Sequence, residues 1–155
     1  MASIFWSIIG RKRRGSIPPD GEYLVTRVLD GDSFNITVNG VVRKCRLSGI
    51  DTPELEQPWG KFAHHILSDL ILARHVRIVF LKRGKYKRLI CHAFVENMNV
   101  QSELIRLGAA HIYPEYVTWD MQIEFAEARQ YAIINQNGIH SGDYNIKPWI
   151  YRSQN

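Results

Sequence analysis

The sequence predicts an α+β fold in which a small five-stranded β-barrel is combined with about three helices. The first half of the chain contains short runs in which apolar and polar residues alternate, as they do in half-buried strands. The pair Asn39-Gly40 marks a tight hairpin between two of these runs. Apolar residues at helical spacing follow in later segments. With 155 residues, of which 45% are hydrophobic, the chain can bury the core of one domain.

The strands come first in the chain. Five are predicted, over residues 22–29, 33–38, 41–48, 76–81 and 89–95. The second and third are joined by Asn39-Gly40, and residues 49–60, which contain Pro53 and Pro58, are predicted as a loop. A basic turn over residues 82–87 joins the last two strands.

The predicted helices are recognised by spacing and by their end signals. Residues 61–73 carry apolar side chains at helical spacing, namely Phe62, Ile66, Leu67, Leu70 and Ile71. A short helix over residues 100–107 ends at Gly108. A longer one over residues 119–136 begins after Thr118 as N-cap and is closed by Gly138, and the tail beyond it is predicted to be irregular. Three strands, a helix, two strands and then helices is the order of an OB-type barrel, which commonly binds oligonucleotides.

The chain divides into an N-terminal arm and linker (1–21), one domain (22–149) and a short C-terminal tail (150–155). The arm begins "MASIFWSIIG" and continues with four basic residues. Its apolar part is shorter than the roughly 20 residues of a membrane span, and no cleavable signal peptide is recognised because the charge follows the apolar run. The arm is compatible with a solvated tail, a nuclear address, or contact between residues 1–14 and a membrane surface. The compartment is therefore left open.

The formal net charge of +5 indicates an anionic partner, either nucleic acid or an acidic membrane surface. Cys45 and Cys91 lie in strand-like runs without a CxxC motif, so two buried free thiols are expected. His64, His65 and His92 lack the spacing of metal ligands, so no zinc site is expected. We also expect a monomer.

Two acidic motifs raise the question of a functional site. Asp30-Gly31-Asp32 fails as an EF-hand, and taken alone it is typical of a turn. The hairpin, however, brings Asp51 and Glu54 in "RLSGIDTPE" back beside Asp32 and Arg46. Two carboxylates with a backbone carbonyl suit Ca²⁺, and a neighbouring arginine suits a phosphate group. A surface salt-bridge cluster with an Asp-Thr-Pro turn is the alternative interpretation.

The register of this hairpin decides whether Asp32 and Arg46 can meet. A two-residue turn pairs Val38 with Val41, sets Asp32 opposite Leu47 and points Arg46 to the other face. That register also places Phe34, Ile36, Cys45 and Leu47 on one core face. A three-residue loop with a bulge at Gly40 would set Asp32 opposite Arg46 instead. We predict a bulge between Cys45 and Ser48, which a regular ladder would contradict.

The segments "DGDSF", "CRLSGIDTPE" and "KYKR" before a strand resemble the thermonuclease family, which has the staphylococcal-nuclease-like fold. The resemblance runs from Val25 to Trp149 and includes "LIRLGAAHIY" and "GIHSGDYNIKPW". It implies that Asp32, Asp51 and the carbonyl of Thr52 bind Ca²⁺, with Asp30 in support. It further implies Glu54 as general base and Arg46 and Arg88 as donors to the phosphoryl oxygens.

The resemblance also implies a substrate surface around the basic turn. Tyr86 matches a tyrosine that contacts the substrate phosphate. Tyr113 and Tyr116 can stack on bases or simply pack against the barrel. The basic side chains of the turn, Lys82, Arg83, Lys85 and Lys87, follow the phosphate backbone or are merely solvated. Lys87 stands where the family has glycine, and its Cβ restricts the turn that carries Arg88. Ser33 in place of threonine and the short loop after Glu54 are further departures.

The activity implied is Ca²⁺-dependent endonuclease cleavage of DNA and RNA with low sequence specificity, leaving 3′-phosphate ends. Single-stranded or locally unpaired nucleic acid is the expected form of the substrate. The alternative is a barrel that binds nucleic acid or protein without cutting. Such degenerate domains typically lose the acids or the arginines, and this chain retains both.

Overall fold

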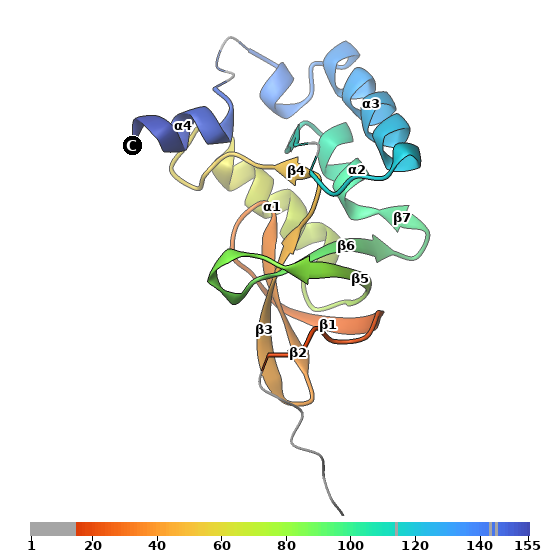
Figure 1. The fold of residues 1–155 in the computed structure, drawn as a ribbon. Helices are drawn as coiled ribbons and strands as arrows, with labels where there is room; N and C mark the ends of the chain where they lie inside the picture. The colour runs from red at the N-terminus through yellow and green to blue at the C-terminus, as the bar shows by residue number, and fades with distance from the viewer. Residues whose placement is uncertain (1–14, 114, 143, 145) are drawn as a thin grey trace, which may run out of the picture.

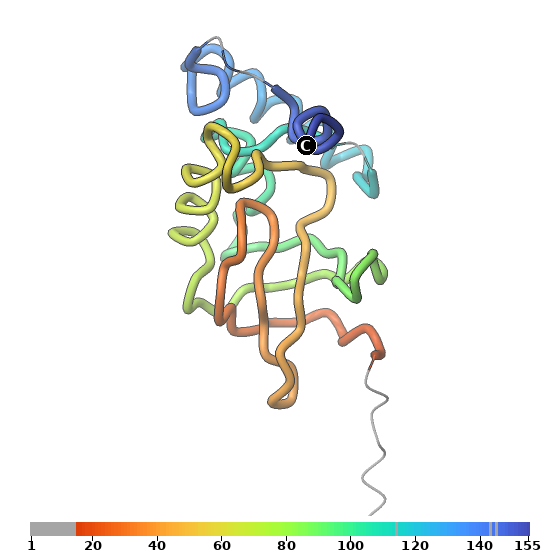
Figure 2. Tube along the Cα trace, turned by 90° about the vertical axis from the view of Figure 1, so that its left-hand side faces the viewer, coloured from red at the N-terminus to blue at the C-terminus, as the bar shows by residue number. Residues whose placement is uncertain are grey.

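The computed structural model describes residues 15–113, 115–142, 144 and 146–155, so the predicted arm of residues 1–14 lies outside the described part of the chain. Figure 1 shows most of the strands in the lower part of the molecule. Above them lie the helices α2 (Val100–Arg106), α3 (Trp119–Ile134) and α4 (Pro148–Gln154). Figure 2, turned by 90°, shows the dark blue C-terminal segment, which contains α4, at the upper, helical end, far from the red N-terminal end of the described chain.

Five strands form a closed barrel, which confirms the predicted OB-type α+β fold. They are β1 (Gly21–Val28), β2 (Ser33–Val38), β3 (Val41–Leu47), β5 (His75–Arg83) and β6 (Leu89–Val95). Antiparallel pairing runs in the order β3-β2-β1-β5-β6, and a parallel pairing of β3 with β6 closes the ring. β7 (Met98–Asn99) extends the sheet beyond β6. β4 (Ile50–Asp51), inside the predicted loop, pairs with β8 (His111–Ile112).

The hairpin of β2 and β3 has the two-residue turn, and the predicted bulge is wrong. Val38 pairs with Val41, and the ladder continues without a shift to Ser33 opposite Arg46. Asn39 and Gly40 both have positive φ, 49° and 76°, as the turn type of a two-residue hairpin requires. The two register shifts near this region lie elsewhere, between Val25 and Arg27 in β1 and between Phe80 and Lys82 in β5.

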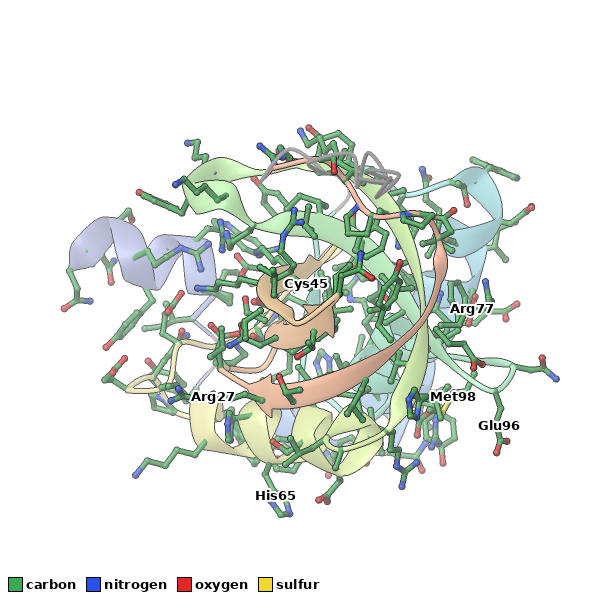
Figure 3. The ribbon with its side chains drawn as sticks, turned by 90° about the horizontal axis from the view of Figure 1, so that it is seen from below. Arg27, Cys45, His65, Arg77, Glu96 and Met98 are labelled. Atoms are coloured by element: carbon green, nitrogen blue, oxygen red, sulfur yellow. The ribbon has the colours of Figure 1, made fainter. Side chains whose placement is uncertain are left out.

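The core face of this hairpin is the one that the sequence predicts. Its four inward side chains are fully buried, namely Phe34, Ile36, Cys45 and Leu47. Cys45 and Cys91 are both buried free thiols, as expected. Figure 3 looks at the barrel from below and shows Cys45 near the centre, while His65 and Glu96 project outward.

Helix α1 (Gly60–Ile71) covers the barrel with a stripe of side chains four residues apart, Ala63, Leu67 and Ile71, all fully buried. Thr118 caps α3 by accepting a hydrogen bond from the backbone N–H of Met121. Between α3 and α4 lies the short 3₁₀ turn η2 (Gly138–His140). None of the helices in the described ranges has the length and apolar character needed to cross a membrane.

The prediction of an irregular C-terminal tail is wrong, because α4 forms there and runs through residue 150. Pro148 stands at its first turn, where a fixed φ favours helix initiation and the missing N–H costs nothing. The helix has only seven residues, too few for a clear periodic pattern. The described chain therefore contains four α-helices rather than about three.

Candidate active site

Two buried carboxylates meet at the upper rim of the barrel. Asp32 lies in the turn before β2, and Asp51 ends β4; their residues are 6% and 2% exposed. The Nη2 atom of Arg46 lies 3.5 Å from Oδ2 of Asp32 and 3.2 Å from Oδ1 of Asp51. One guanidinium thus faces both carboxylates, which places the two acids on the same side of the site.

Arg46 reaches Asp32 without the bulge. Asp32 precedes β2, so the alternation of strand side chains does not fix its direction. The Arg46 side chain is long, and its Nη1 donates to the carbonyls of Leu47 and Ile50 at 2.9 and 3.3 Å. These bonds hold the guanidinium over the rim. The bulge is unnecessary because the Arg46 side chain is long enough to reach Asp32 from a regular strand.

Thr52 fixes the carboxylate of Asp32. Its backbone N–H and its hydroxyl each donate to Oδ2 of Asp32 at 3.2 Å, and Ser33 Oγ donates to Oδ1 at 3.1 Å. The Asp30-Gly31-Asp32 turn packs directly on Thr52, since a Cβ at Gly31 would lie 2.6 Å from Thr52 Oγ1. The absence of a side chain at Gly31 is what allows this approach.

Asp30 supports the same turn. Its Oδ1 accepts a hydrogen bond from the backbone N–H of Asp32 at 3.0 Å. Burial, and after it the nearby charge of Asp32, raise the pKa of Asp30 to about 6. Burial also raises the pKa of Asp51, opposed by Arg152 and Arg46. Acids crowded in this way form a region where added positive charge is favourable.

Glu54 follows β4 in a tightly packed loop. Its backbone N–H donates to Oε1 of Gln57 at 3.1 Å, and a Cβ at Gly60 would fall 1.8 Å from its carbonyl oxygen. The loop and the start of α1 are therefore in direct contact. The Glu54 side chain is 36% exposed and points to the same rim as Asp51, since both bind the guanidinium of Arg152.

Arg88 comes from the turn between β5 and β6, which contains the 3₁₀ turn η1 (Lys85–Lys87). Tyr86 and Lys87 both have left-handed backbones, with φ of 58° and 59°. Lys87 thus accepts the conformation that glycine adopts most easily. Arg88 Nε donates to the carbonyl of Lys85 at 3.3 Å, and the guanidinium lies 5.9 Å from the Tyr86 ring centroid.

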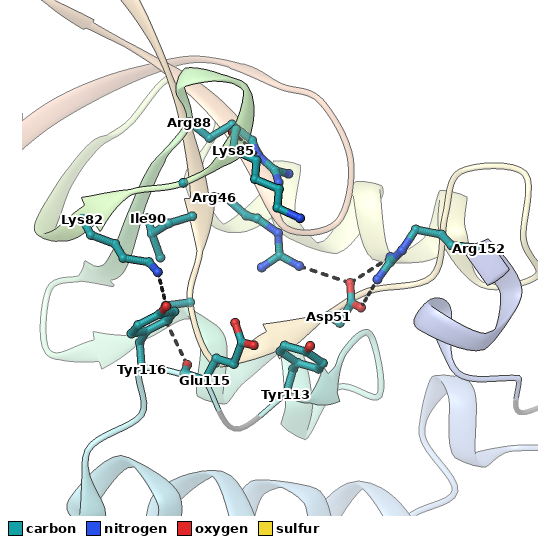
Figure 4. Close-up of a pocket in the computed structure, with 13 residues that line it drawn as sticks. Arg46, Asp51, Lys82, Lys85, Arg88, Ile90, Tyr113, Glu115, Tyr116 and Arg152 are labelled. Atoms are coloured by element: carbon teal, nitrogen blue, oxygen red, sulfur yellow. Dashed lines mark hydrogen bonds and ion pairs between the residues drawn. The ribbon is translucent and has the colours of Figure 1, made fainter. Parts of the chain in front are cut away.

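Two adjoining pockets contain most of these groups. The acidic pocket, of about 380 Å³, is lined by Asp30, Asp32, Arg46, Asp51, Thr52, Pro53, Glu54, Lys85, Tyr86, Arg88 and Arg152. The tyrosine pocket, of about 480 Å³ and drawn in Figure 4, adds Lys82, Tyr113 and Tyr116. The two share Arg46, Asp51, Lys85, Arg88 and Arg152. Lys87 and Arg83 line neither pocket.

The three predicted substrate tyrosines lie in different surroundings. Tyr86 is 87% exposed at the edge of the acidic pocket. Tyr113 packs on Trp149 with ring centroids 5.6 Å apart. Tyr116 accepts a hydrogen bond from Lys82, whose Nζ also lies 3.8 Å from its ring centroid. Both Tyr113 and Tyr116 line a pocket, and each already has a packing partner.

Arg152 and Gln57 are site residues that the sequence did not reveal. Arg152 lies in α4, 101 residues beyond Asp51 in the chain, and only the fold brings it there. Gln57 is 3% exposed and links the Glu54 loop to the C-terminal segment by donating to the carbonyl of Ile146 at 2.6 Å. Pro148 at a helix start was the one available signal for α4, and it says nothing of where Arg152 points.

The histidines have other partners. His64 Nε2 lies 3.2 Å from the carbonyl oxygen of Val28, and His92 Nδ1 lies 2.8 Å from Gln101 Nε2. Within the part of the chain that the structure describes, no group of three or more His, Cys, Asp or Glu side chains gathers as a metal site. A cation at the rim would therefore use two carboxylates together with backbone carbonyl and water oxygens, a hard and variable donor set that suits Ca²⁺.

A closed five-stranded OB-type barrel with a pocket of carboxylates and arginines at its rim has the groups that a small hydrolase acting on phosphodiester bonds requires. The comparisons with known proteins agree. Residues 44–141, more than half of the chain, match the family model described as "Staphylococcal nuclease homologue". The chain belongs to this family, and it is a nuclease.

Its relatives bear names of the same kind. A protein of Escherichia coli named "Uncharacterized endonuclease" is 31% identical over 130 residues, which cover 83% of this chain and 82% of the relative. A Haemophilus influenzae protein of the same name is 28% identical, over 84% of this chain and 72% of the relative. The "Staphylococcal-like nuclease CAN1" of Arabidopsis thaliana is 28% identical over 70% of this chain, and the match spans 33% of that longer protein.

Proposed function

We propose that this nuclease is a Ca²⁺-dependent endonuclease that cleaves DNA and RNA with little sequence preference and leaves 3′-phosphate ends. The observation that carries the proposal is the acidic pocket, where Asp32, Asp51 and Glu54 face the same cavity as Arg46 and Arg88. The first two are buried carboxylates that one guanidinium contacts, and the third is partly exposed to solvent. In-line attack on a phosphodiester needs a base for water and cationic donors at the phosphoryl oxygens.

Asp32, Asp51 and the carbonyl of Thr52 are the groups that would hold Ca²⁺, which when bound supplies positive charge to a non-bridging phosphoryl oxygen. Glu54 accepts the proton of the attacking water as the bond between phosphorus and the 5′-oxygen breaks. Arg46 donates to the phosphoryl oxygens, and Arg88 donates near the leaving oxygen. Each donor of this kind is typically worth about 3–4 kcal/mol of the barrier.

The first test incubates the purified protein with plasmid, single-stranded DNA and RNA, in Ca²⁺ or in a chelator. We expect cleavage in Ca²⁺, none in chelator, and products that polymerase extends only after phosphatase treatment. The Asp51→Asn variant should lose both Ca²⁺ binding and cleavage but should still bind nucleic acid. Nucleic-acid binding without cleavage under any divalent cation would favour the alternative of a non-catalytic binding module.

We further propose that the enzyme acts as a monomer on single-stranded or locally unpaired nucleic acid, and that residues 1–14 contact a membrane surface. The open pockets of the described chain, lined by arginine, lysine and tyrosine, suit an unpaired strand with accessible bases. The apolar and basic composition of residues 1–14 suits an anionic interface. Cleavage rates on single-stranded and double-stranded DNA of the same sequence test the preference for unpaired strands. Sedimentation equilibrium tests the monomeric state. Liposome co-sedimentation of the protein with and without residues 1–14 tests the membrane contact.

A further inference from the structure

The guanidinium of Arg152 bridges Asp51, a proposed Ca²⁺ ligand, and Glu54, the proposed general base. Its Nη2 lies 2.6 Å from Oδ2 of Asp51, and its Nη1 donates to Oδ1 of Asp51 at 3.3 Å and to Oε1 of Glu54 at 2.7 Å. Figure 4 shows Arg152 approaching Asp51 from the side opposite to Arg46. Arg46 and Arg152 thus enclose Asp51, whose side chain is 3% exposed.

Helix α4 is held against the site by contacts at its N-terminal end. Gln57 donates to the carbonyl of Ile146 and also binds the backbone of Glu54, which ties the C-terminal segment to the Glu54 loop. Directly after Ile146 in the chain, Lys147 Nζ lies 3.0 Å from His111 Nδ1, and the Trp149 ring packs on Tyr113. The position of Arg152 is therefore set by the fold, although its side chain is 45% exposed.

Glu54 depends on this contact for its orientation. Its side chain is 36% exposed, and among the described residues Arg152 provides the only hydrogen bond to its carboxylate. The bond occupies Oε1 and directs the carboxylate toward Asp51, leaving Oε2 for the proton of a water. A carboxylate on an exposed loop would otherwise sample several rotamers, and general-base catalysis needs a fixed distance to the water.

We propose that Arg152 is a positioning residue that orients Glu54 as the general base of the nuclease. The role rests on the proposed function, in which Glu54 is the base and Asp51 a Ca²⁺ ligand. Arg152 also places a positive charge against Asp51, so it opposes cation binding there. Removing it should therefore change two observables in opposite directions: turnover falls because Glu54 loses its orientation, and Ca²⁺ binds more tightly.

The experiment compares the full chain with Arg152→Gln. Turnover of a single-stranded oligonucleotide is measured at saturating Ca²⁺, and Ca²⁺ affinity is measured by calorimetry without substrate. We expect kcat to fall about tenfold or more, which is part of the roughly 10²–10⁴-fold that a general base contributes, with KM little changed. The Kd for Ca²⁺ should decrease severalfold. Arg152→Lys keeps the charge but not the two-pronged bridge, so its Ca²⁺ affinity should stay near the parent value while kcat falls.

Two further variants isolate the route through Glu54. In a Glu54→Gln background, Arg152→Gln should cause little additional loss of kcat, because the residue acts through Glu54. Arg106→Gln is the matched control: Arg106 also makes a two-pronged ion pair, with Glu103, and its side chain is 40% exposed, but it lines neither active-site pocket. This control should leave kcat and Ca²⁺ affinity unchanged.

Other outcomes would overturn the proposal, each in a different way. A rise in kcat together with tighter Ca²⁺ binding would make Arg152 an inhibitory competitor of the cation. A rise in KM alone would make it a substrate contact, and parallel losses of melting temperature, Ca²⁺ affinity and kcat would make it merely structural. If the parent cleaves and Glu54→Gln does not, but Arg152→Gln equals the parent, this role alone fails. If the parent does not cleave in Ca²⁺, the proposed function fails with it.

Discussion

Asp32 owes its place in the site to the residue before it. Gly31 has no side chain, and the turn packs so closely that a Cβ there would lie 2.6 Å from Thr52 Oγ1 and 2.7 Å from the Ala63 Cβ. Thr52 in turn holds Asp32 by two hydrogen bonds. A methyl group at Gly31 would therefore push against Ala63 of α1, which destabilises the fold, and against Thr52, which displaces Asp32 in the site.

We predict that Gly31→Ala destabilises the protein by about 1–3 kcal/mol, the usual cost of overpacking, and weakens Ca²⁺ binding because Asp32 is displaced. Urea unfolding and calorimetric Ca²⁺ titration measure the two effects. Gly142→Ala is the matched control, since nothing lies within 4 Å of a Cβ there, and its effect should stay within about 0.5 kcal/mol. Equal stability of Gly31→Ala and the parent would show that the turn can move away from Thr52.

The carboxylates and arginines of the rim were predictable at the scale of residues because one hairpin joins their motifs. Asp32 comes directly before β2 and Arg46 lies near the end of β3, so one hairpin carries both, and Asp51 and Glu54 follow within eight residues of Arg46. Arg152 was not predictable in this way. Its partners are 98 and 101 residues away, so its role depends on how α4 docks.

At the scale of elements, the turn that carries Arg88 contains an unfavourable backbone conformation. Tyr86 and Lys87 are consecutive residues with left-handed backbones, which cost about 1–2 kcal/mol each for residues with a Cβ. The structure nevertheless brings Arg88 to both pockets, so the left-handed backbone at Lys87 strains the turn without moving the arginine away.

Lys87→Gly should relieve part of that strain. Glycine adopts φ near 59° readily, although it costs about 0.5–1 kcal/mol more backbone entropy on folding. We expect a net stabilisation of about 0.5–1 kcal/mol, measured by urea unfolding. Lys85→Gly, in the same turn but without positive φ, should destabilise by a similar amount. Destabilisation by both variants would mean that the left-handed backbone at Lys87 is not strained.

The elements differed in how clearly the sequence marked them. The strands of the β2–β3 hairpin were marked by alternation and by Asn39-Gly40, and their boundaries agree with the structure to within one residue. Helix α3 was marked by its Thr118 cap. β4 and β8 have two residues each and exist only because Asp51 and His111 pair across the fold. Such short elements carry no periodic pattern, and tertiary contacts alone determine them.

At the scale of the whole molecule, the pH dependence of stability has a buried histidine as one source. His111 is 5% exposed, and burial lowers its pKa to about 3, with the positive charges of Lys147, His140 and Arg129 acting in the same direction. In the unfolded chain its pKa is near 6.5. Between these values the unfolded chain binds a proton that the folded protein rejects. This contribution to stability is present above pH 6.5 and is lost as the pH falls.

We predict that the parent loses about 2 kcal/mol more stability than His111→Gln between pH of about 7 and about 5, at about 1.4 kcal/mol per pH unit below the unfolded pKa. Asp30 acts in the opposite sense, because its raised pKa favours the folded state below about 6. Both the parent and His111→Gln contain Asp30, so its contribution cancels when their stabilities are subtracted. Urea unfolding at both pH values measures it, and His65→Gln, with a 72% exposed side chain, is the control. Identical pH dependence of parent and His111→Gln would contradict the assignment.

The net charge of +5 and the basic lining of the pockets should make binding of nucleic acid depend strongly on salt. For a single strand, each phosphate contact contributes about −0.7 to the slope of log K against log salt. Lys85 and Lys87 belong to the same turn, but only Lys85 lines the pockets. We therefore expect Lys85→Gln to reduce the slope by about 0.7 and Lys87→Gln to leave it unchanged, measured by fluorescence anisotropy in the Glu54→Gln background. Equal reductions by both variants would place the strand over the outer face of the turn instead of in the pockets.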